Sequence, residues 1–167
     1  MSLPSLASRS SRAPNRRDVR KFLLDSNCYI DASRNAQALM ALQEFVTWAA
    51  PGLHVSSVVA AELRAGARSV RDRRIVEDRL LGPFARNDRI LTPSAAAWDA
   101  LGRTLATLRD RDGLALAQVN RSFAFDVLIA FTCREHGALL VTANARDMTR
   151  IRRIFAFDFV APYPAVP

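Results

Sequence analysis

The amino-acid sequence predicts an α/β domain with a central, mostly parallel sheet of about four to five strands. Short apolar runs, such as 22–24 and 138–141, alternate with longer segments whose apolar residues recur at helical spacing. Strands separated by helices favour a parallel sheet that is covered by helices on both faces. We therefore expect a three-layer α/β/α arrangement.

The first half of the ordered chain is expected to alternate in this way from residue 21. Ser57 can cap the helix that follows it, and Gly66 lies near the end of that helix. The expected elements are a strand at 21–25, a helix at 33–50, a turn and strand at 51–57, a helix at 58–68, a charged helix at 71–86 and a short strand at 89–93.

The second half is expected to begin with two long helices. Gly113 and Gly137 follow their last helical residues, where glycine commonly ends a helix. The expected elements are helices at 94–113 and 122–137, a buried strand at 138–142, a turn entering a helix at 143–151 and a last short strand at 157–160.

Composition indicates one soluble globular domain. Half of the 167 residues are hydrophobic and 24% are charged. No apolar run approaches the roughly 20 residues of a membrane helix. The two cysteines and two histidines supply neither a disulfide framework nor a four-ligand zinc site, although Cys133 and His136 could share a helix face. We expect a reducing, intracellular setting.

Residues 1–19 are expected to be a disordered tail, followed by one domain at 20–167. The tail is rich in serine, arginine and proline and lacks apolar periodicity. Residues 1–21 hold six basic side chains against one acidic one, which gives +5 of the net charge of +8. A plain tail is favoured over a transit peptide, and the absence of a long apolar core argues against a secretory signal.

Four carboxylates differ from the rest, most of which lie among arginines on polar helix faces. Asp25 ends an apolar strand, and Glu62 follows the apolar stretch VVAA. Asp126 is embedded in FAFDVLIAF, and Asp147 follows the strand ALLVT across a short turn. Ionised carboxylates are seldom buried without partners. Asp25 can be a helix cap, and Asp126 can pair with a distant arginine, but both can also hold a metal.

A divalent cation would give a cluster of these acids a function. Converging carboxylates repel one another, and Mg²⁺ or Mn²⁺ removes that repulsion through the oxygen ligands that these ions prefer. Such a cation can activate water and stabilise charge on a phosphoryl oxygen.

The order and spacing of these motifs resemble the PIN domain, the nuclease fold of VapC-type toxins. The resemblance runs from about residue 21 to 160 and lies in LLDSN, SSVVAAELRAG and FDVLIAFTCREHGALLVTANARDM. It implies that Asp25 and Asp126 are the principal metal ligands and Glu62 the third acid. The fourth position falls at Asp147 or Asn144, and we favour Asp147.

The same resemblance assigns supporting roles. Ser26 and Asn27 match the small polar residues after the first aspartate, and Thr142 and Asn144 are candidate hydrogen-bonding neighbours of the acids. Basic side chains that could hold an RNA backbone, or be plain surface charge, are Arg64, Arg68 and Arg146. The family's usual phenylalanine after the last aspartate is Met148 here.

The resemblance implies a Mg²⁺-dependent endoribonuclease, with Mn²⁺ as a substitute, that is the toxin of a type II toxin–antitoxin pair. It also implies a cytoplasmic homodimer, a small VapB-like antitoxin and no membrane partner. The alternative is a non-catalytic PIN-fold module that binds RNA or protein. A haloacid-dehalogenase-like phosphatase would need an aspartate where Asn27 stands, and a dinucleotide-binding domain would need a glycine-rich turn after the first strand.

Overall fold

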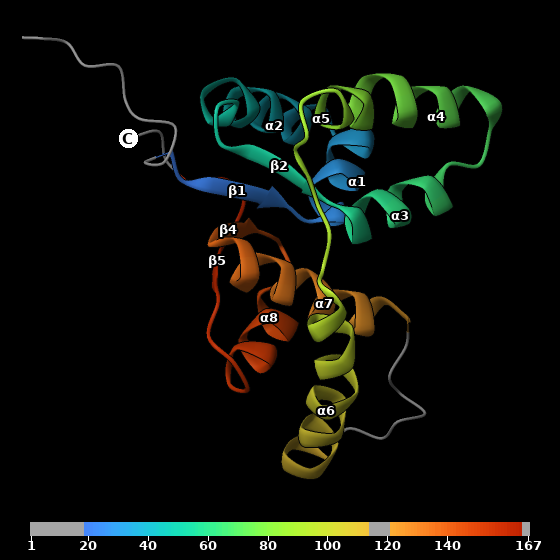
Figure 1. Cartoon of the computed structure of the whole chain (residues 1–167). Helices are drawn as coiled ribbons and strands as arrows, with labels where there is room; N and C mark the ends of the chain where they lie inside the picture. Colours follow the sequence, from blue (N-terminus) through green and yellow to red (C-terminus); the bar gives the residue numbers. More distant parts are fainter. Residues whose placement is uncertain (1–18, 114–120, 165–167) are drawn as a thin grey trace, which may run out of the picture.

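The computed structural model describes residues 19–113 and 121–164, so the expected tail lies outside the described residues except for Val19. Its centre is a five-stranded parallel sheet with the strand order β3-β2-β1-β4-β5 (Figure 1). The predicted α/β fold with four to five parallel strands is therefore confirmed. The strands are β1 (Lys21–Leu24), β2 (Leu53–Ser56), β3 (Ile90–Leu91), β4 (Ala138–Val141) and β5 (Asp158–Val160).

Helical segments connect the strands and cover the sheet. None of them, among the described residues, is long and apolar enough to cross a membrane. They are α1 (Ser26–Arg34), α2 (Ala36–Ala49), α3 (Ser57–Gly66), α4 (Val70–Arg74), the π-helix η1 (Ile75–Leu81), α5 (Gly82–Ala85), α6 (Ala95–Asp112), α7 (Arg121–His136) and α8 (Ala145–Arg152).

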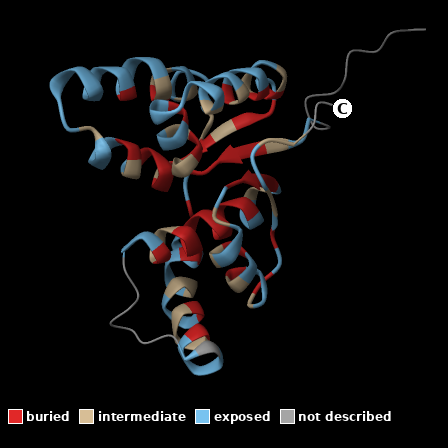
Figure 2. Ribbon diagram, turned by 180° about the vertical axis from the view of Figure 1, so that it is seen from behind, coloured by how far each residue is buried: buried red, intermediate tan, exposed pale blue. Residues whose placement is uncertain are grey.

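The sheet separates two apolar cores. Phe22 and Leu24 of β1 pack with α1 and α2, where Phe45 is fully buried. Leu23 faces the other way and packs with α3, α7 and α8. Buried residues line the strands and the inward helix faces, while exposed residues cover the outside (Figure 2). Because each fully buried large apolar side chain contributes about 1.5–3 kcal/mol, these two cores hold the sheet edge rigidly in place.

The helix predicted at 33–50 corresponds to α2 at 36–49, but the separate helix α1 that precedes it was not predicted. Asn35 separates them with an extended backbone (φ −137°, ψ 122°), and its side chain accepts hydrogen bonds from the backbone N–H groups of Gln37 and Ala38. Asparagine is a preferred residue at such a helix start. The residues Cys28 and Ala32 are the only buried ones on α1, so its apolar stripe is too short to predict the helix.

Two further boundaries differ from prediction and two agree. Ser56, not Ser57, caps α3, because its hydroxyl accepts from the backbone of Val58. The helix expected at 71–86 is divided into α4, η1 and α5. Gly113 and Gly137 lie where helices were predicted to end, with φ of 63° and 62°, in the left-handed region that favours glycine.

Candidate active site

Asp25 lies at the carboxyl edge of the sheet, between β1 and α1. Its backbone N–H donates to the carbonyl of Val141 at 3.0 Å, which extends the β1–β4 pairing by one residue. Its Oδ1 accepts from the backbone N–H of Ser26 at 2.7 Å. Asp25 is therefore the N-cap of α1, and it is also 3% exposed at an edge where α/β folds place their ligands.

Thr142 and Asn27 hold the other oxygen of Asp25. The Thr142 hydroxyl donates to Asp25 Oδ2 at 2.6 Å, and Asn27 Nδ2 donates to the same oxygen at 2.7 Å. Thr142 Oγ1 also accepts from Asn27 Nδ2 at 3.1 Å and from the backbone N–H of Asn144 at 3.0 Å. Because Leu24 and Val141 are paired, the residues that follow each strand meet at this edge.

Asn144 joins the remaining two aspartates. It is the N-cap of α8, and its Oδ1 accepts from the backbone N–H of Asp147 at 3.4 Å. Its Nδ2 donates to Asp126 Oδ2 at 3.0 Å and to Asp147 Oδ2 at 3.1 Å. The carboxamide thus holds together two carboxylates that would otherwise repel each other.

Glu62 approaches the cluster from α3. Its Oε2 is buried and has no hydrogen-bond partner among the described residues. Burial raises the pKa of Glu62, and the charge of Asp25 raises it further, while a hydrogen bond from Ser26 and the charge of Arg121 oppose the shift. A buried carboxylate oxygen without a donor is costly unless it has some other partner.

The four carboxylates are close enough to perturb one another. Burial is the main cause that raises the pKa of Asp126 to about 8, and the charges of Asp25, Asp147 and Glu62 raise it in that order. Burial also raises the pKa of Asp25, although its hydrogen bonds oppose this. The structure therefore brings all four predicted acids into one electrostatic cluster.

The cluster fits a hard divalent cation, though not as a ready-made cage. Within residues 19–113 and 121–164, no three His, Cys, Asp or Glu side chains are arranged to hold one ion together. Mg²⁺ usually needs only one or two carboxylates and keeps several waters. The unpartnered Oε2 of Glu62 and the mutual repulsion at Asp126 are what such an ion would relieve.

The predicted basic residues are placed unequally. Arg64 pairs with Glu77 through two bonds of 2.7 and 3.0 Å, so its guanidinium is already engaged. Arg68 and Arg146 are exposed. The basic side chain that acts on Glu62 is instead Arg121, at the start of α7, which was not among the predicted RNA-binding residues. Only its position, five residues before Asp126, could have indicated from the sequence that Arg121 lies near the acids.

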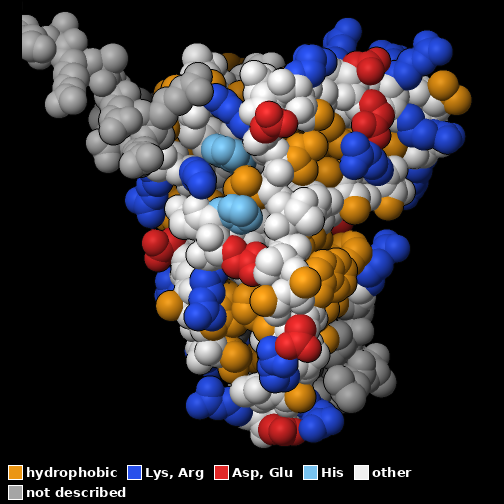
Figure 3. All heavy atoms as spheres, viewed as in Figure 1, with side chains coloured by type: hydrophobic (Ala, Val, Ile, Leu, Met, Phe, Trp, Pro, Cys, Tyr) orange, Lys and Arg blue, Asp and Glu red, His pale blue; other side chains and the backbone are white. Residues whose placement is uncertain are grey.

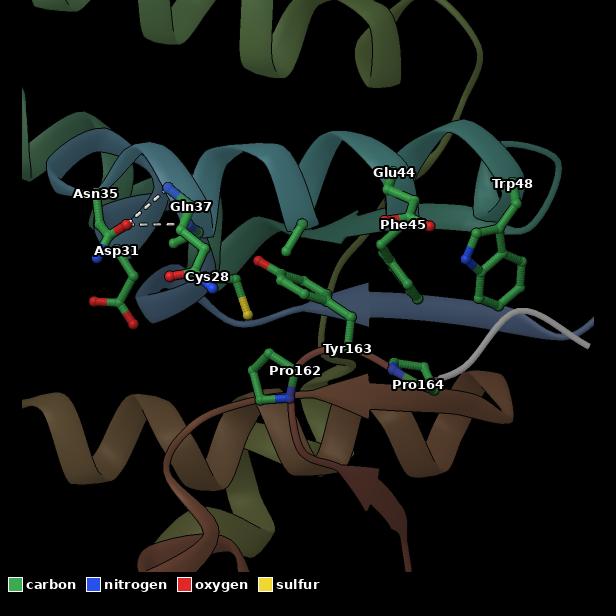
Figure 4. Close-up of a pocket in the computed structure, with 12 residues that line it drawn as sticks. Cys28, Asp31, Asn35, Gln37, Glu44, Phe45, Trp48, Pro162, Tyr163 and Pro164 are labelled. Atoms are coloured by element: carbon green, nitrogen blue, oxygen red, sulfur yellow. Dashed lines mark hydrogen bonds between the residues drawn. The ribbon is translucent and has the colours of Figure 1, made fainter.

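A separate pocket of about 530 Å³ lies between α1, α2 and the segment 162–164 (Figure 4). Phe45, Trp48 and Tyr163 line it, but none of the four clustered carboxylates does. Burial raises the pKa of the Cys28 thiol in its wall to about 12, so this cysteine is a poor nucleophile at neutral pH. The pocket therefore offers no catalytic group comparable to the carboxylate cluster.

Replacing Thr142 with valine is expected to cost about 1–3 kcal/mol of stability, because the donors from Asn27 and Asn144 lose their acceptor. Any metal-dependent activity should fall by about 10–100-fold, the usual effect of removing a group that orients a metal ligand. Thr132→Val is the matched control, since buried Thr132 donates, among the residues that the structure describes, only to the Leu128 carbonyl within α7. Thermal unfolding measures the stability of the two variants and turnover measures their activity. Equal activity of the two variants would contradict a role for Thr142.

The metal-free protein is expected to lose stability as the pH rises from about 4 to about 8. The pKa of Asp126 is about 8 in the fold against an ordinary 3.8, so ionisation disfavours the folded state across that window. The raised pKa values of Asp25 and Glu62 act in the same direction. Thermal unfolding in EDTA should give a melting temperature lower by about 5 °C or more at the alkaline end.

His54 must be separated from this effect. Burial lowers its pKa below 6.5, so it adds stability that is lost as the pH falls, opposite to the carboxylates. The difference between the parent and Asp126→Asn at each pH isolates the carboxylate contribution. A difference that does not change with pH would show that Asp126 titrates normally.

The fold and the site define a class: parallel α/β proteins with an acidic cluster at the carboxyl edge of the sheet. A family model for the PIN domain matches residues 22–154. The chain therefore belongs to the PIN domain family, as its motifs predicted. No curated protein matches the sequence.

Solved structures share the fold at low sequence identity. DNA-bound VapBC from Salmonella typhimurium matches with a TM-score of 0.62 and 23% identity, over 86% of this chain and 99% of that chain. VapBC2 from Rickettsia felis, bound to a promoter DNA fragment, matches with a TM-score of 0.58 and 22% identity, over 84% of this chain and 97% of that chain. A toxin–antitoxin complex from Klebsiella pneumoniae matches with a TM-score of 0.51 and 20% identity, over 87% of this chain and 100% of that chain.

Proposed function

We propose that this PIN domain is a Mg²⁺-dependent endoribonuclease and the toxin of a type II toxin–antitoxin pair. The observation that carries the proposal is the convergence of Asp25, Glu62, Asp126 and Asp147: burial, and then the charges of the other three acids, raise the pKa of Asp126 to about 8. Perturbed carboxylates gathered at a sheet edge are typical of catalytic sites. Purely structural acids would not be gathered where their charges oppose one another.

Asp25 and Asp126 would hold the cation, with Glu62 and Asp147 completing its surroundings directly or through water. The bound ion would activate a water molecule and stabilise the charge that develops on a phosphoryl oxygen. Mn²⁺ would serve as a substitute, because it prefers the same oxygen ligands.

The chain's own residues keep these carboxylates in place. Thr142 and Asn27 fix one oxygen of Asp25, and Asn144 spaces Asp126 from Asp147. Since every one of these donors contacts a carboxylate, the oxygens stay fixed without needing to reorganise. Asp126, with a pKa of about 8, holds a proton at neutral pH in the metal-free protein. A cation would favour its ionised form.

Partners follow from the same proposal. The complexes that share this fold include VapBC from two bacteria and a toxin–antitoxin complex from a third. We accordingly assign this chain a small VapB-like antitoxin, RNA as its substrate, a homodimeric state and a cytoplasmic location. A basic group of the antitoxin would suit the acidic cluster through charge complementarity.

The test is cleavage of total RNA by the purified chain with Mg²⁺, with Mn²⁺ and with EDTA, followed by sequencing of the new RNA ends. Turnover with either metal and none with EDTA supports the nuclease. RNA or protein binding without turnover would instead identify the non-catalytic module. A gel-filtration mass in the same buffers tests the homodimer.

A further inference from the structure

Two arginines of α8 and Arg153, which caps its carboxyl end, line an open hollow of about 570 Å³. Arg146, Arg150 and Arg153 are separated by four and three residues, so they form one stripe along the helix. The other lining residues are Ala145 and Thr149, so no acidic side chain lines the hollow. We call this surface the α8 stripe.

The α8 stripe begins beside the carboxylate cluster. Arg146 directly precedes Asp147, whose carboxylate accepts the hydrogen bond from Asn144. Arg150 lies one turn further along, with its guanidinium 5.8 Å from the ring centre of Phe123 on α7. Seven residues of helix separate Arg146 from Arg153, about 10 Å at 1.5 Å per residue. The stripe is therefore a cationic path that leads away from the cluster.

A second basic side chain that acts on the cluster lies beside an aromatic ring of α7. Arg121, which acts on Glu62, lies 5.9 Å from the ring centre of half-buried Phe125. Phe125 directly precedes Asp126 in α7. Cationic grooves with neighbouring aromatic side chains are typical of proteins that bind single-stranded nucleic acid, because backbone phosphates and base faces are both satisfied.

We propose that the α8 stripe binds the phosphate backbone of single-stranded RNA and leads it to the carboxylates. This inference rests on the proposed function, because it assumes that the cluster acts on RNA. The planar guanidinium of arginine matches phosphate oxygens in a bidentate manner. A row of arginines that starts beside the cluster would place successive phosphates on one side of it.

A second arginine-lined hollow provides a matched comparison. Arg71, Arg74 and Arg79 line about 490 Å³ on α4 and η1, together with acidic Asp78. Basic side chains, here arginines, gather over this end of the molecule in Figure 3. None of its lining residues adjoins a clustered carboxylate in sequence or by a hydrogen bond within the described chain. The number of arginines alone thus does not distinguish the two surfaces.

The experiment compares RNA binding by two triple variants, each in an Asp126→Asn background without divalent metal, so that no RNA is cut. One carries Arg146→Gln, Arg150→Gln and Arg153→Gln. The control carries Arg71→Gln, Arg74→Gln and Arg79→Gln. Fluorescence anisotropy with a 5′-labelled single-stranded RNA of mixed sequence, at several salt concentrations, gives the affinity and its salt slope.

The α8 triple variant is expected to lose affinity by about tenfold or more, and its salt slope should be shallower by about 2, near 0.7 per lost phosphate contact. The control variant should show smaller changes in both the affinity and the salt slope. Equal losses in both variants would overturn the proposal, as would equally tight, stripe-dependent binding of duplex RNA of the same sequence. Because Arg150 contacts Phe123, the double variant Arg146→Gln/Arg153→Gln serves if the triple variant does not fold.

Failure of this inference and failure of the proposed function give different results. If the parent chain binds RNA through the α8 stripe but never cuts it, the proposed RNA-binding surface stands and the proposed nuclease activity fails. If the parent chain cuts RNA with Mg²⁺ but the α8 variant binds RNA as tightly as the control variant, the nuclease activity stands and the role of the α8 stripe fails.

Discussion

Replacing Asp25 with asparagine is expected to lower RNA cleavage by about 100-fold or more, which corresponds to about 3 kcal/mol in the activation barrier. The carboxylate at this position is buried at the sheet edge and belongs to the cluster that we assign to the cation. Asparagine keeps the size and one oxygen of the side chain but removes its charge. Initial rates with saturating Mg²⁺ measure the effect.

The fold should tolerate this change. Asparagine caps helices about as well as aspartate, so the bond from the Ser26 backbone to the cap is retained. The amide nitrogen would face the Asn27 donor and the Thr142 hydroxyl. The hydroxyl can turn to accept, so the change costs about one hydrogen bond, but the burial of a charge is relieved. We expect a net change in stability within about 1 kcal/mol, since the two effects oppose each other.

Asp110→Asn is the control for Asp25→Asn. Asp110 is exposed on α6 and pairs with its neighbour Arg109 at 2.9 Å, far in the sequence from the clustered acids. Surface pairs of this kind contribute about 0–1 kcal/mol, so neither cleavage nor stability should change appreciably. Full cleavage by Asp25→Asn would return Asp25 to the role of a helix cap alone.

The fold was predictable because its signals are local. The runs 22–24 and 138–141 are apolar on both faces, and the structure buries both in the centre of the sheet. Gly113 and Gly137 end helices through their own backbone freedom. By contrast, α1 is mostly polar and buries only Cys28 and Ala32, so its sequence has no apolar periodicity long enough to predict a helix. Its formation depends on Asp25 and on packing against α2.

The candidate acids were predictable for a different reason. Asp126 was conspicuous because a carboxylate inside an apolar helix needs an explanation, and the structure supplies one in the bond from Asn144. The hydrogen-bonding network was not predictable in the same way. Thr142 and Asp25 lie 117 residues apart, and only the register of β1 against β4 brings them together. The choice of Asp147 over Asn144 as the fourth acid stays a prediction; the structure shows that the Asn144 amide donates to both Asp126 and Asp147.

Replacing Asp126 with asparagine is expected to stabilise the metal-free protein while abolishing most of its cleavage. The parent's Asp126 has a pKa of about 8, and ionisation in the fold is opposed by burial and by three neighbouring acids. Asparagine can still accept the bond from Asn144 Nδ2, so little is lost when the charge is removed. The stabilisation should be on the order of 3 kcal/mol at about pH 8. It should become small near the ordinary pKa of 3.8 and vanish at lower pH, where both states are protonated.

Added Mg²⁺ should reverse the order of stability between the two proteins. An ion that binds only the folded state raises the melting temperature, and it should raise that of the parent more because the parent keeps all four charges. The surface variant Asp99→Asn, which loses only a pair with Arg103 on α6, should be unchanged or slightly less stable and should respond to Mg²⁺ as the parent does. Thermal unfolding in EDTA and in Mg²⁺, with cleavage measured on the same preparations, separates the cases. If Asp126→Asn proved less stable than the parent without metal and cut RNA at the parent's rate, Asp126 would be a structural carboxylate and the metal assignment would fail.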